Sequence, residues 1–357
     1  MIYVNKPFLP DYSLYESYIK KIWESNVLTN NGPLVRQLEE ELKHFLNVKH
    51  LFFTSNGTIA IQIALKALNI RKEVITTPFS YVATTNCILW ENCIPVFADI
   101  NSIDYNIDVN KIKEKISSET QAILATHVYG NPCNVSAIKK LADEHNLKVI
   151  YDGAHAFSTL YEGKQLLSYG DISTCSFHAT KLFHTVEGGC VITDDDEIAN
   201  RIMLFRQFGH VDEEYLSVGI NGKNSEFHAA MGLSILPSIK DIKQSRKDTC
   251  ELYQSLLRDL HISQPQALKD TEYNYAYFPV VFENEDILQK VKSELQKINI
   301  HTRRYFYPSL NKLPFVEESH CPVSEKISTC VLCLPLYNNF DRKNVHIIAD
   351  CIRNILN

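Results

Sequence analysis

A lysine and an aspartate, each directly after a strand-like segment, are the residues of this sequence best suited to covalent chemistry. Lys181 follows Ile172–Phe177, a run of β-branched, aromatic and small apolar residues, and precedes the glycine pair of Glu187-Gly188-Gly189. Asp152 follows the apolar run KVIY. A lysine amine at a buried strand end can add to an aldehyde carbon, and a carboxylate can balance a positive charge beside it. The alternatives are a solvated lysine and an aspartate that caps the next helix.

A glycine turn upstream is a candidate anion site. The strand-like LFFT at residues 51–54 runs into the turn SNGT and then into the helix-like IAIQIALKAL. This order leaves free backbone N–H groups at a helix N-terminus, which favour a bound anion. Gly57 lets the backbone approach a ligand closely, and Ser55, Asn56 or Thr58 can cap the helix or bond a phosphate. An ordinary helix N-cap is the alternative interpretation.

Alternating strands and helices must position these residues. The segments expected as strands are 51–54, 73–78, 94–100, 122–128, 148–151, 172–177 and 190–193, and the intervening helices are 81–90, 109–116 and 135–145. This alternation is typical of βαβ units and a mostly parallel sheet, in which ligands bind beyond the carboxyl ends of the strands. We therefore expect an α/β fold in which Asp152, Lys181 and the SNGT turn meet at one edge of the sheet.

The composition changes in the last third of the chain. Helices are expected at 226–239 and 242–260, and then strands at 275–282, 300–308 and 331–337 with helices at 287–297 and 344–355. A chain of 357 residues is longer than one typical domain. We expect a large domain at residues 1–244, flanked by helices, and a smaller C-terminal α+β domain at residues 245–357.

Composition disfavours several classes of function. A net charge of −6 provides no basic surface for nucleic acid or an anionic membrane. No apolar stretch has the length of a transmembrane helix and the N-terminus lacks a signal-peptide pattern, so we expect a cytoplasmic protein. The cysteines lie mostly in apolar runs, which indicates buried reduced thiols, and Cys330 and Cys333 lack a second pair at zinc-site spacing. We expect no metal.

The candidate residues together meet the needs of pyridoxal 5′-phosphate. This cofactor requires a lysine amine for its aldehyde, a carboxylate that keeps the pyridine nitrogen protonated, and N–H and hydroxyl donors around its phosphate. Gly57-Thr58, Asp152, Ser176 with Lys181, and Asn221 all fall at strand ends or in adjoining loops. A dinucleotide-binding protein is disfavoured, because no G-x-G-x-x-G follows the first strand.

The chain resembles the DegT/DnrJ/EryC1/StrS family of nucleotide-sugar aminotransferases over nearly its whole length. The similarity rests on SNGTIAIQIALKAL, TTPFSYVATTNCIL, IPVFADI, THVYGNP, YDGAHAF, GDISTCSFHATK, EGG and GINGKNSEFHAAMG, in that order. The resemblance implies the fold-type I architecture of aspartate aminotransferase and pyridoxal 5′-phosphate as cofactor. It also implies a homodimer whose active sites are shared across the interface.

The resemblance assigns roles to individual residues. Lys181 is similar to the catalytic lysine that bonds the cofactor aldehyde, and Asp152 is similar to the partner of the pyridine nitrogen. The further cofactor-binding residues that it implies are Gly57, Thr58 and Ser176 at the phosphate, Tyr81 on the ring, His155 near the 3-hydroxyl, and Asn221 at the phosphate of the neighbouring subunit. His155 stands where the family commonly has Gln.

Basic, polar and aromatic residues are the candidates for binding the two substrates. Many members have Arg two residues after the asparagine, where this chain has Lys223, and a lysine offers a point charge instead of a bidentate fork. Lys223, Arg303 and Arg304 therefore all stay open as ligands of the carboxylate of the amino donor, L-glutamate. Further candidates for the sugar-nucleotide pocket are Thr29, Asn31, Tyr305 and Tyr307.

The expected substrate follows from four segments, VNKPFLP, LTNNGP, SFHATK and HTVEGG. They are most similar to members that aminate C4 of dTDP-4-keto-6-deoxyglucose, giving dTDP-4-amino-4,6-dideoxyglucose (viosamine) for bacterial surface polysaccharide such as O-antigen. A C3-aminating or UDP-sugar aminotransferase is the alternative, since one cofactor site serves them all. Lys181 disfavours a sugar dehydratase of this fold, which has histidine there, and Asp152 together with Lys181 disfavours a non-catalytic regulator.

Overall fold

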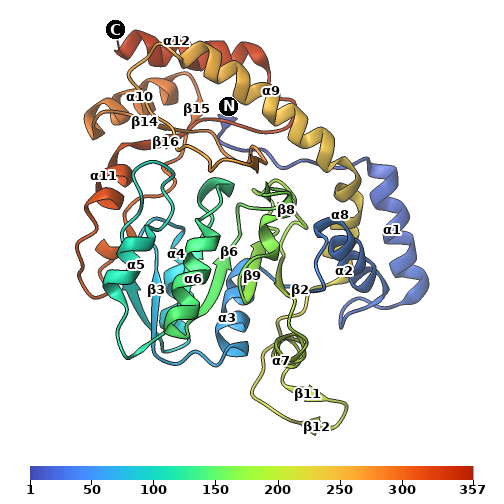
Figure 1. Ribbon diagram of the computed structural model, residues 1–357. Coiled ribbons are helices and arrows are strands. Elements are labelled where there is room, and N and C mark those ends of the chain that lie inside the picture. Colours follow the sequence, from blue (N-terminus) through green and yellow to red (C-terminus); the bar gives the residue numbers. More distant parts are fainter. Residues whose placement is uncertain (357) are drawn as a thin grey trace.

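The centre of the molecule is a seven-stranded sheet in the order β2-β10-β9-β6-β5-β3-β4 (Figure 1). In this computed structural model, which describes residues 1–356, its strands are β2 (His50–Thr54), β3 (Glu73–Thr76), β4 (Ile94–Phe97), β5 (Thr120–Thr126), β6 (Lys148–Asp152), β9 (Ile172–Ser176) and β10 (Gly189–Thr193). All neighbours pair in parallel except β10, which runs antiparallel to β2 and β9. The expected mostly parallel α/β sheet is confirmed.

Helices cover both faces of this sheet, which explains why its inner strands are apolar at nearly every position. Side chains alternate along β5: Ile123 and Ala125 join one apolar cluster, whereas Ala122 and Leu124 join the other. The first cluster contains α2 (Pro33–Leu46), α5 (Val109–Lys115), α6 (Val135–His145) and α8 (Glu226–Ile235), and the second contains α3 (Gly57–Ala67), α4 (Val82–Trp90) and α7 (Asp196–Arg206).

A third apolar cluster occupies the C-terminal part of the chain. It is built from α9 (Ile239–Leu257), α10 (Glu285–Lys297), α12 (Arg342–Leu356), β14 (Pro279–Val281) and β16 (Val331–Cys333). The N-terminal β1 (Ile2–Tyr3) pairs in parallel with β15 (Ile300–His301), so the start of the chain lies in this C-terminal part of the molecule. The expected domain boundary between residues 244 and 245 falls inside α9, and that division stays a prediction.

Several expected elements differ in extent from those in the structure. The strands expected at 275–282 and 300–308 are regular only at Pro279–Val281 and Ile300–His301. The helix expected at 226–239 ends at Ile235, because Pro237 lacks an N–H and its ring clashes with a helical carbonyl; a 3₁₀ turn follows. The helix expected at 135–145 is confirmed as α6, and the first helix of the chain is α1 (Tyr12–Ser25).

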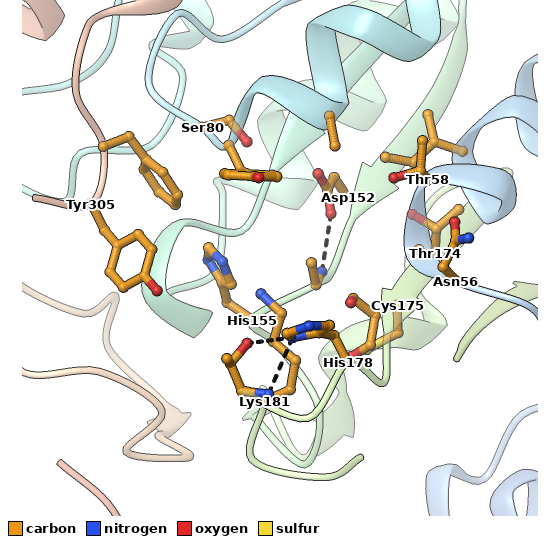
Figure 2. A pocket seen from close by; sticks show the side chains of 18 of the residues that line it. Asn56, Thr58, Ser80, Asp152, His155, Thr174, Cys175, His178, Lys181 and Tyr305 are labelled. Atoms are coloured by element: carbon orange, nitrogen blue, oxygen red, sulfur yellow. Dashed lines mark hydrogen bonds between the residues drawn. The ribbon is translucent and has the colours of Figure 1, made fainter. Parts of the chain in front are cut away.

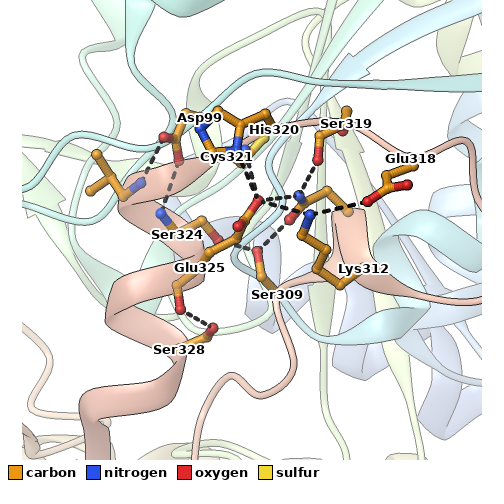
Figure 3. Close-up of polar contacts among 12 residues, drawn as sticks. Asp99, Ser309, Lys312, Glu318, Ser319, His320, Cys321, Ser324, Glu325 and Ser328 are labelled. Carbon is orange, nitrogen blue, oxygen red and sulfur yellow. Dashed lines mark hydrogen bonds and ion pairs between the residues drawn. The ribbon is translucent and has the colours of Figure 1, made fainter. Parts of the chain in front are cut away.

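A polar network, which was not anticipated, fastens α11 (Pro322–Cys330) to the end of β4 (Figure 3). The carboxylate of Asp99 accepts hydrogen bonds from the N–H groups of Val323 and Ser324, both at 2.9 Å. A carboxylate at this place satisfies amides that have no partner inside the helix and interacts favourably with the helix dipole. The segment between β15 and β16 is thereby held against the central sheet.

The remaining general expectations concern membranes, thiols and metals. Among the helices of the described chain, none combines the length and apolar character that crossing a bilayer requires. All ten cysteines are free and all except Cys351 are buried. Within residues 1–356, no group of three or more His, Cys, Asp and Glu side chains is arranged for a metal ion.

Candidate active site

The ends of β6 and β9 and the N-terminus of α3 open into one cavity of about 250 Å³ (Figure 2). Its lining includes nine of the expected site residues: Gly57, Thr58, Tyr81, Asp152, His155, Ser176, Lys181, Arg303 and Tyr305. Strand order explains the meeting, because β6 neighbours β9, and β10 joins β9 to β2. Figure 2 shows Asp152, His155 and Lys181 around one space, with Tyr305 on one side and Thr58 on the other.

Lys181 is placed by the loop that follows β9. The loop closes on itself, since the Phe177 N–H donates to the Gly188 carbonyl and the Ala179 N–H donates to the Val186 carbonyl, both at 2.8 Å. The amine donates to the hydroxyl of Tyr277, with 3.4 Å between nitrogen and oxygen. Desolvation lowers the pKa of Lys181, and the charge of Asp152 opposes this. A lowered pKa leaves a larger fraction of the amine neutral, as a nucleophile or general base requires.

Asp152 is buried at the last position of β6, and two hydrogen bonds fix its carboxylate. Oδ2 accepts from the hydroxyl of Thr84 at 2.7 Å and Oδ1 accepts from the Ala154 N–H at 3.1 Å. Burial raises the pKa of Asp152, whereas these two bonds and Lys181 lower it. No helix begins directly after Asp152, so the helix-cap alternative is wrong. An oriented carboxylate beside a cavity is suited to stabilise a cationic ring nitrogen.

His155 presents a hydrogen-bond donor to the cavity. Its Nδ1 accepts from the Tyr129 N–H at 3.2 Å, which places the proton of the neutral ring on Nε2. Desolvation, with a further contribution from Lys181, holds the pKa of His155 well below its ordinary value, so the ring stays neutral. The ring stacks on Phe306 with a centroid distance of 5.5 Å. His155 can therefore donate from a fixed orientation.

The N-terminus of α3 forms a cradle for an anion. Asn56 caps the helix, because its Oδ1 accepts from the Ile59 N–H at 2.8 Å. The amides of Gly57 and Thr58 have no partner within residues 1–356. A Cβ added to Gly57 would lie 2.9 Å from the Cβ of Ser176, so only glycine allows this close approach. Two amides, two hydroxyls and the helix dipole converge, as phosphate binding requires.

The aromatic residue expected over the cofactor ring also borders the cavity. Tyr81 stands just before α4 and lines the cavity, and it is 54% exposed although its neighbour Ser80 is buried. A large aromatic side chain left open in this way can cover the face of a planar ligand.

Six expected residues lie outside the cavity of the single chain. Arg304 pairs with Glu285 at 2.9 Å, and its guanidinium stacks on Tyr307 with 3.5 Å to the ring centroid. The other four are Thr29, Asn31, Asn221 and Lys223. Their expected roles, including the approach of Asn221 to a neighbouring subunit, stay predictions.

Three residues that support the site were not predicted from the sequence. Thr84 holds Asp152, Tyr277 holds the lysine amine, and Phe306 supports His155. A local signal existed for Tyr277, since the tyrosines at 273, 275 and 277 alternate, but that pattern predicted only a strand. Thr84 had no signal, because a buried threonine in a helix is common.

Known proteins resemble this chain over nearly its full length. The model of the DegT/DnrJ/EryC1/StrS aminotransferase family matches residues 14–353. The chain is 38% identical to a dTDP-4-amino-4,6-dideoxy-D-glucose transaminase of Shigella dysenteriae, over 99% of both chains. It is 39% identical to another transaminase of that name from Escherichia coli, over 96% of this chain and 95% of the relative. A crystal structure of DesI in the presence of its TDP-sugar product has a TM-score of 0.95 at 30% identity, covering 99% of this chain and 92% of that chain.

Proposed function

Because the chain belongs to the DegT/DnrJ/EryC1/StrS aminotransferase family, we propose that it transfers an amino group from L-glutamate to C4 of dTDP-4-keto-6-deoxyglucose. The chain is a pyridoxal-phosphate-dependent nucleotide-sugar aminotransferase, as the family match establishes. The observation that supports the C4 sugar is the identity of 38% and 39%, over nearly the full length, to two transaminases named for dTDP-4-amino-4,6-dideoxy-D-glucose. That product would serve bacterial surface polysaccharide such as O-antigen.

The cavity residues fit pyridoxal 5′-phosphate. Gly57, Thr58 and Ser176 would hold the phosphate, because the close approach of α3 to β9 leaves amides and hydroxyls free there. Asp152 would bind the pyridine nitrogen and His155 would donate to the 3-hydroxyl. When bound, this cofactor supplies an aldehyde for amine exchange and an electron sink for the carbon that loses its proton.

Lys181 and Asp152 carry the chemistry that the chain itself performs. The Lys181 amine would take a proton from the α-carbon of L-glutamate and, in the second half-reaction, would give a proton to the sugar carbon that becomes aminated. Its pKa, lowered by burial, keeps a neutral amine available for this task. Asp152 would remain anionic beside a protonated ring nitrogen, since two hydrogen bonds already stabilise its charged form. The nucleotide would serve as a handle that positions the keto carbon.

Arg303 is the basic residue best placed for the donor carboxylate. It lines the cavity, and its guanidinium lies 4.8 Å from the ring centroid of Tyr305. No carboxylate within residues 1–356 pairs with Arg303, whereas Arg304 is paired with Glu285. Lys223 lies over the ring of Phe208, at 4.7 Å from the centroid, outside this cavity. A free guanidinium fork binds a carboxylate through two parallel hydrogen bonds.

The proposed homodimer would complete the site from a second chain. The hairpin of β11 (His210–Val211) and β12 (Glu214–Tyr215) projects from the body (Figure 1), and Asn221 follows it. Exposed apolar side chains on this arm, such as Val218 at 81%, are typical of a buried interface. Mixing inactive Lys181→Ala and Asn221→Ala proteins should restore part of the activity if sites are shared, and light scattering gives the mass directly.

Product analysis tests the reaction. The purified protein is incubated with L-glutamate and a set of dTDP- and UDP-linked keto-sugars, and NMR locates the new amine. We expect amination at C4 of the dTDP sugar; an amine at C3, or turnover of UDP-sugars alone, would replace this proposal by the alternative. Lys181→Ala should abolish turnover, whereas Lys140→Ala, an exposed lysine on α6, should retain it. Wild-type turnover by Lys181→Ala would overturn the assignment of the lysine.

A further inference from the structure

Within residues 1–356, the one side chain that hydrogen-bonds the Lys181 amine is the phenol of Tyr277. Tyr277 lies just before β14 in the C-terminal part, whereas Lys181 follows β9 of the central sheet. We propose that Tyr277 is a positioning residue that holds the Lys181 amine in the cavity wall between its proton-transfer steps. This inference rests on the proposed role of Lys181, and it assigns a function to a residue of the C-terminal part.

The segment that carries Tyr277 is fastened to the loop after β6. Asn274 is completely buried, and its Nδ2 donates to the carbonyls of His155 and Phe157 at 2.7 and 2.9 Å. Its Oδ1 accepts from the Ala276 N–H at 3.1 Å. The Asn274 side chain therefore makes three hydrogen bonds. They fix the position of the segment that carries Tyr277 relative to the loop after β6, which contains His155.

A buried arginine also hydrogen-bonds the segment that carries Tyr277. Arg246 of α9 is 4% exposed, and its Nη1 donates to the Ala276 carbonyl at 3.2 Å. The hydroxyl of Tyr273 donates to the carbonyl of Tyr129 at 2.6 Å. The segment just before Tyr277 is thus tied to α9 and to the turn after β5, which limits the freedom of the Tyr277 side chain.

Aromatic packing then fixes the direction of the phenol. The ring of Tyr277 meets the ring of His155 at 4.7 Å between centroids, with an interplanar angle of 64°. Tyr129 and Tyr305 lie at 5.7 and 5.5 Å on other sides. These three rings pack against Tyr277, and its hydroxyl lies 3.4 Å from the Lys181 amine.

A phenol is suited to a lysine that changes its protonation state. The hydroxyl can accept a hydrogen bond from an ammonium and can donate one to a neutral amine. Burial raises the pKa of Tyr277, so the hydroxyl keeps its proton across the working range. A phenylalanine at this position would preserve the ring contacts and leave the amine without a partner.

The test compares Tyr277→Phe with Tyr275→Phe. Tyr275 is a matched control because it lies two residues away on the same segment, packs against Tyr273, and does not line the active-site cavity. In the cofactor-free full chain, the rate at which acetic anhydride modifies Lys181 is followed against pH by mass spectrometry. A hydrogen bond to a charged group is stronger than one to a neutral group, so Tyr277→Phe should raise Lys181 reactivity by about threefold near neutral pH. Tyr275→Phe should leave the rate unchanged.

The loaded enzyme provides a second measurement. Tyr277→Phe should lower kcat by about tenfold, because the amine is no longer held in line, while KM for both substrates stays within about twofold. Should Tyr277→Phe fail to fold by circular dichroism, Tyr277→Met, which replaces the phenol by a smaller apolar side chain, is measured in the same way. Wild-type reactivity of Lys181 in these variants at every pH would overturn the inference, whatever happens to kcat. Failure of the proposed sugar amination is distinguishable, since the modification of Lys181 needs no substrate.

Discussion

Replacing Thr84 by valine removes the hydrogen bond that orients Asp152, together with a contact of the same hydroxyl to Ser80 at 2.8 Å. The Thr84 hydroxyl donates to Oδ2 over 2.7 Å, and both residues are buried. Valine keeps the shape of the side chain and removes the donor. A hydrogen bond to a charged group contributes about 1.5–3 kcal/mol, and the free energy of unfolding of Thr84→Val should therefore fall by about 2 kcal/mol near neutral pH.

The loss should grow with pH. Burial raises the pKa of Asp152 above its ordinary value of 3.8, and the Thr84 hydroxyl opposes this, so valine raises the pKa further. Between 3.8 and the raised pKa, the folded protein binds more protons than the unfolded chain, and stability declines as pH rises. Because the variant has the higher folded-state pKa, its deficit relative to wild type should be larger at about pH 7 than at about pH 5.

Thr85 is the control for this substitution. It is buried next to Thr84 on α4, yet its hydroxyl has no hydrogen-bond partner in the described chain. Thr85→Val should therefore be neutral or stabilising. Urea unfolding between about pH 5 and about pH 8 gives the stabilities, and absorbance titration gives the affinity for pyridoxal 5′-phosphate, which should be about tenfold weaker in Thr84→Val only. Equal unfolding free energies for the two variants near neutral pH would refute the reasoning.

Three further outcomes are expected. Gly57→Ala should weaken pyridoxal 5′-phosphate binding in an absorbance titration by at least about tenfold, since its Cβ would lie 2.9 Å from that of Ser176; unchanged affinity would contradict the cradle. Arg303→Gln should raise KM for L-glutamate by about tenfold or more with KM for the sugar nucleotide unchanged, and the same result from Lys223→Gln instead would move the carboxylate site. Lys181→Met should stabilise the cofactor-free protein against urea. Because burial lowers the pKa of Lys181, this gain should be largest below that pKa and should shrink as pH rises toward 10.5; a gain independent of pH would be inconsistent with a buried amine.

Two general physical rules allow the sequence to predict the sheet and the closeness of Asp152 to Lys181. Strands buried on both faces are apolar throughout, and the carboxyl ends of parallel strands must share an edge. Neither statement depends on details of packing. The same reasoning places the SNGT turn at that edge, because β2 joins the sheet through β10.

The sequence cannot decide between the adjacent Arg303 and Arg304. They leave an extended segment in different directions, and the bridge between Arg303 and Cys333 decides which one faces the cavity. That pairing is a tertiary contact with no local signal. The role of Tyr277 is equally hard to predict. Its alternating aromatic neighbours predict a strand, whereas Asn274 hydrogen-bonds the loop after β6 and the backbone before Tyr277 is irregular.

The parallel pair of β1 and β15 has a consequence for how the molecule is made. Ile2 lies opposite Ile300, so this contact closes a loop that contains most of the 357 residues. The entropic cost of closing such a loop grows only slowly with its length, but contacts of this separation form late. During synthesis, β1 therefore stays unpaired until β15 has left the ribosome. A bulky tag fused ahead of Met1 would therefore slow the final docking of the C-terminal part more than the assembly of the central sheet.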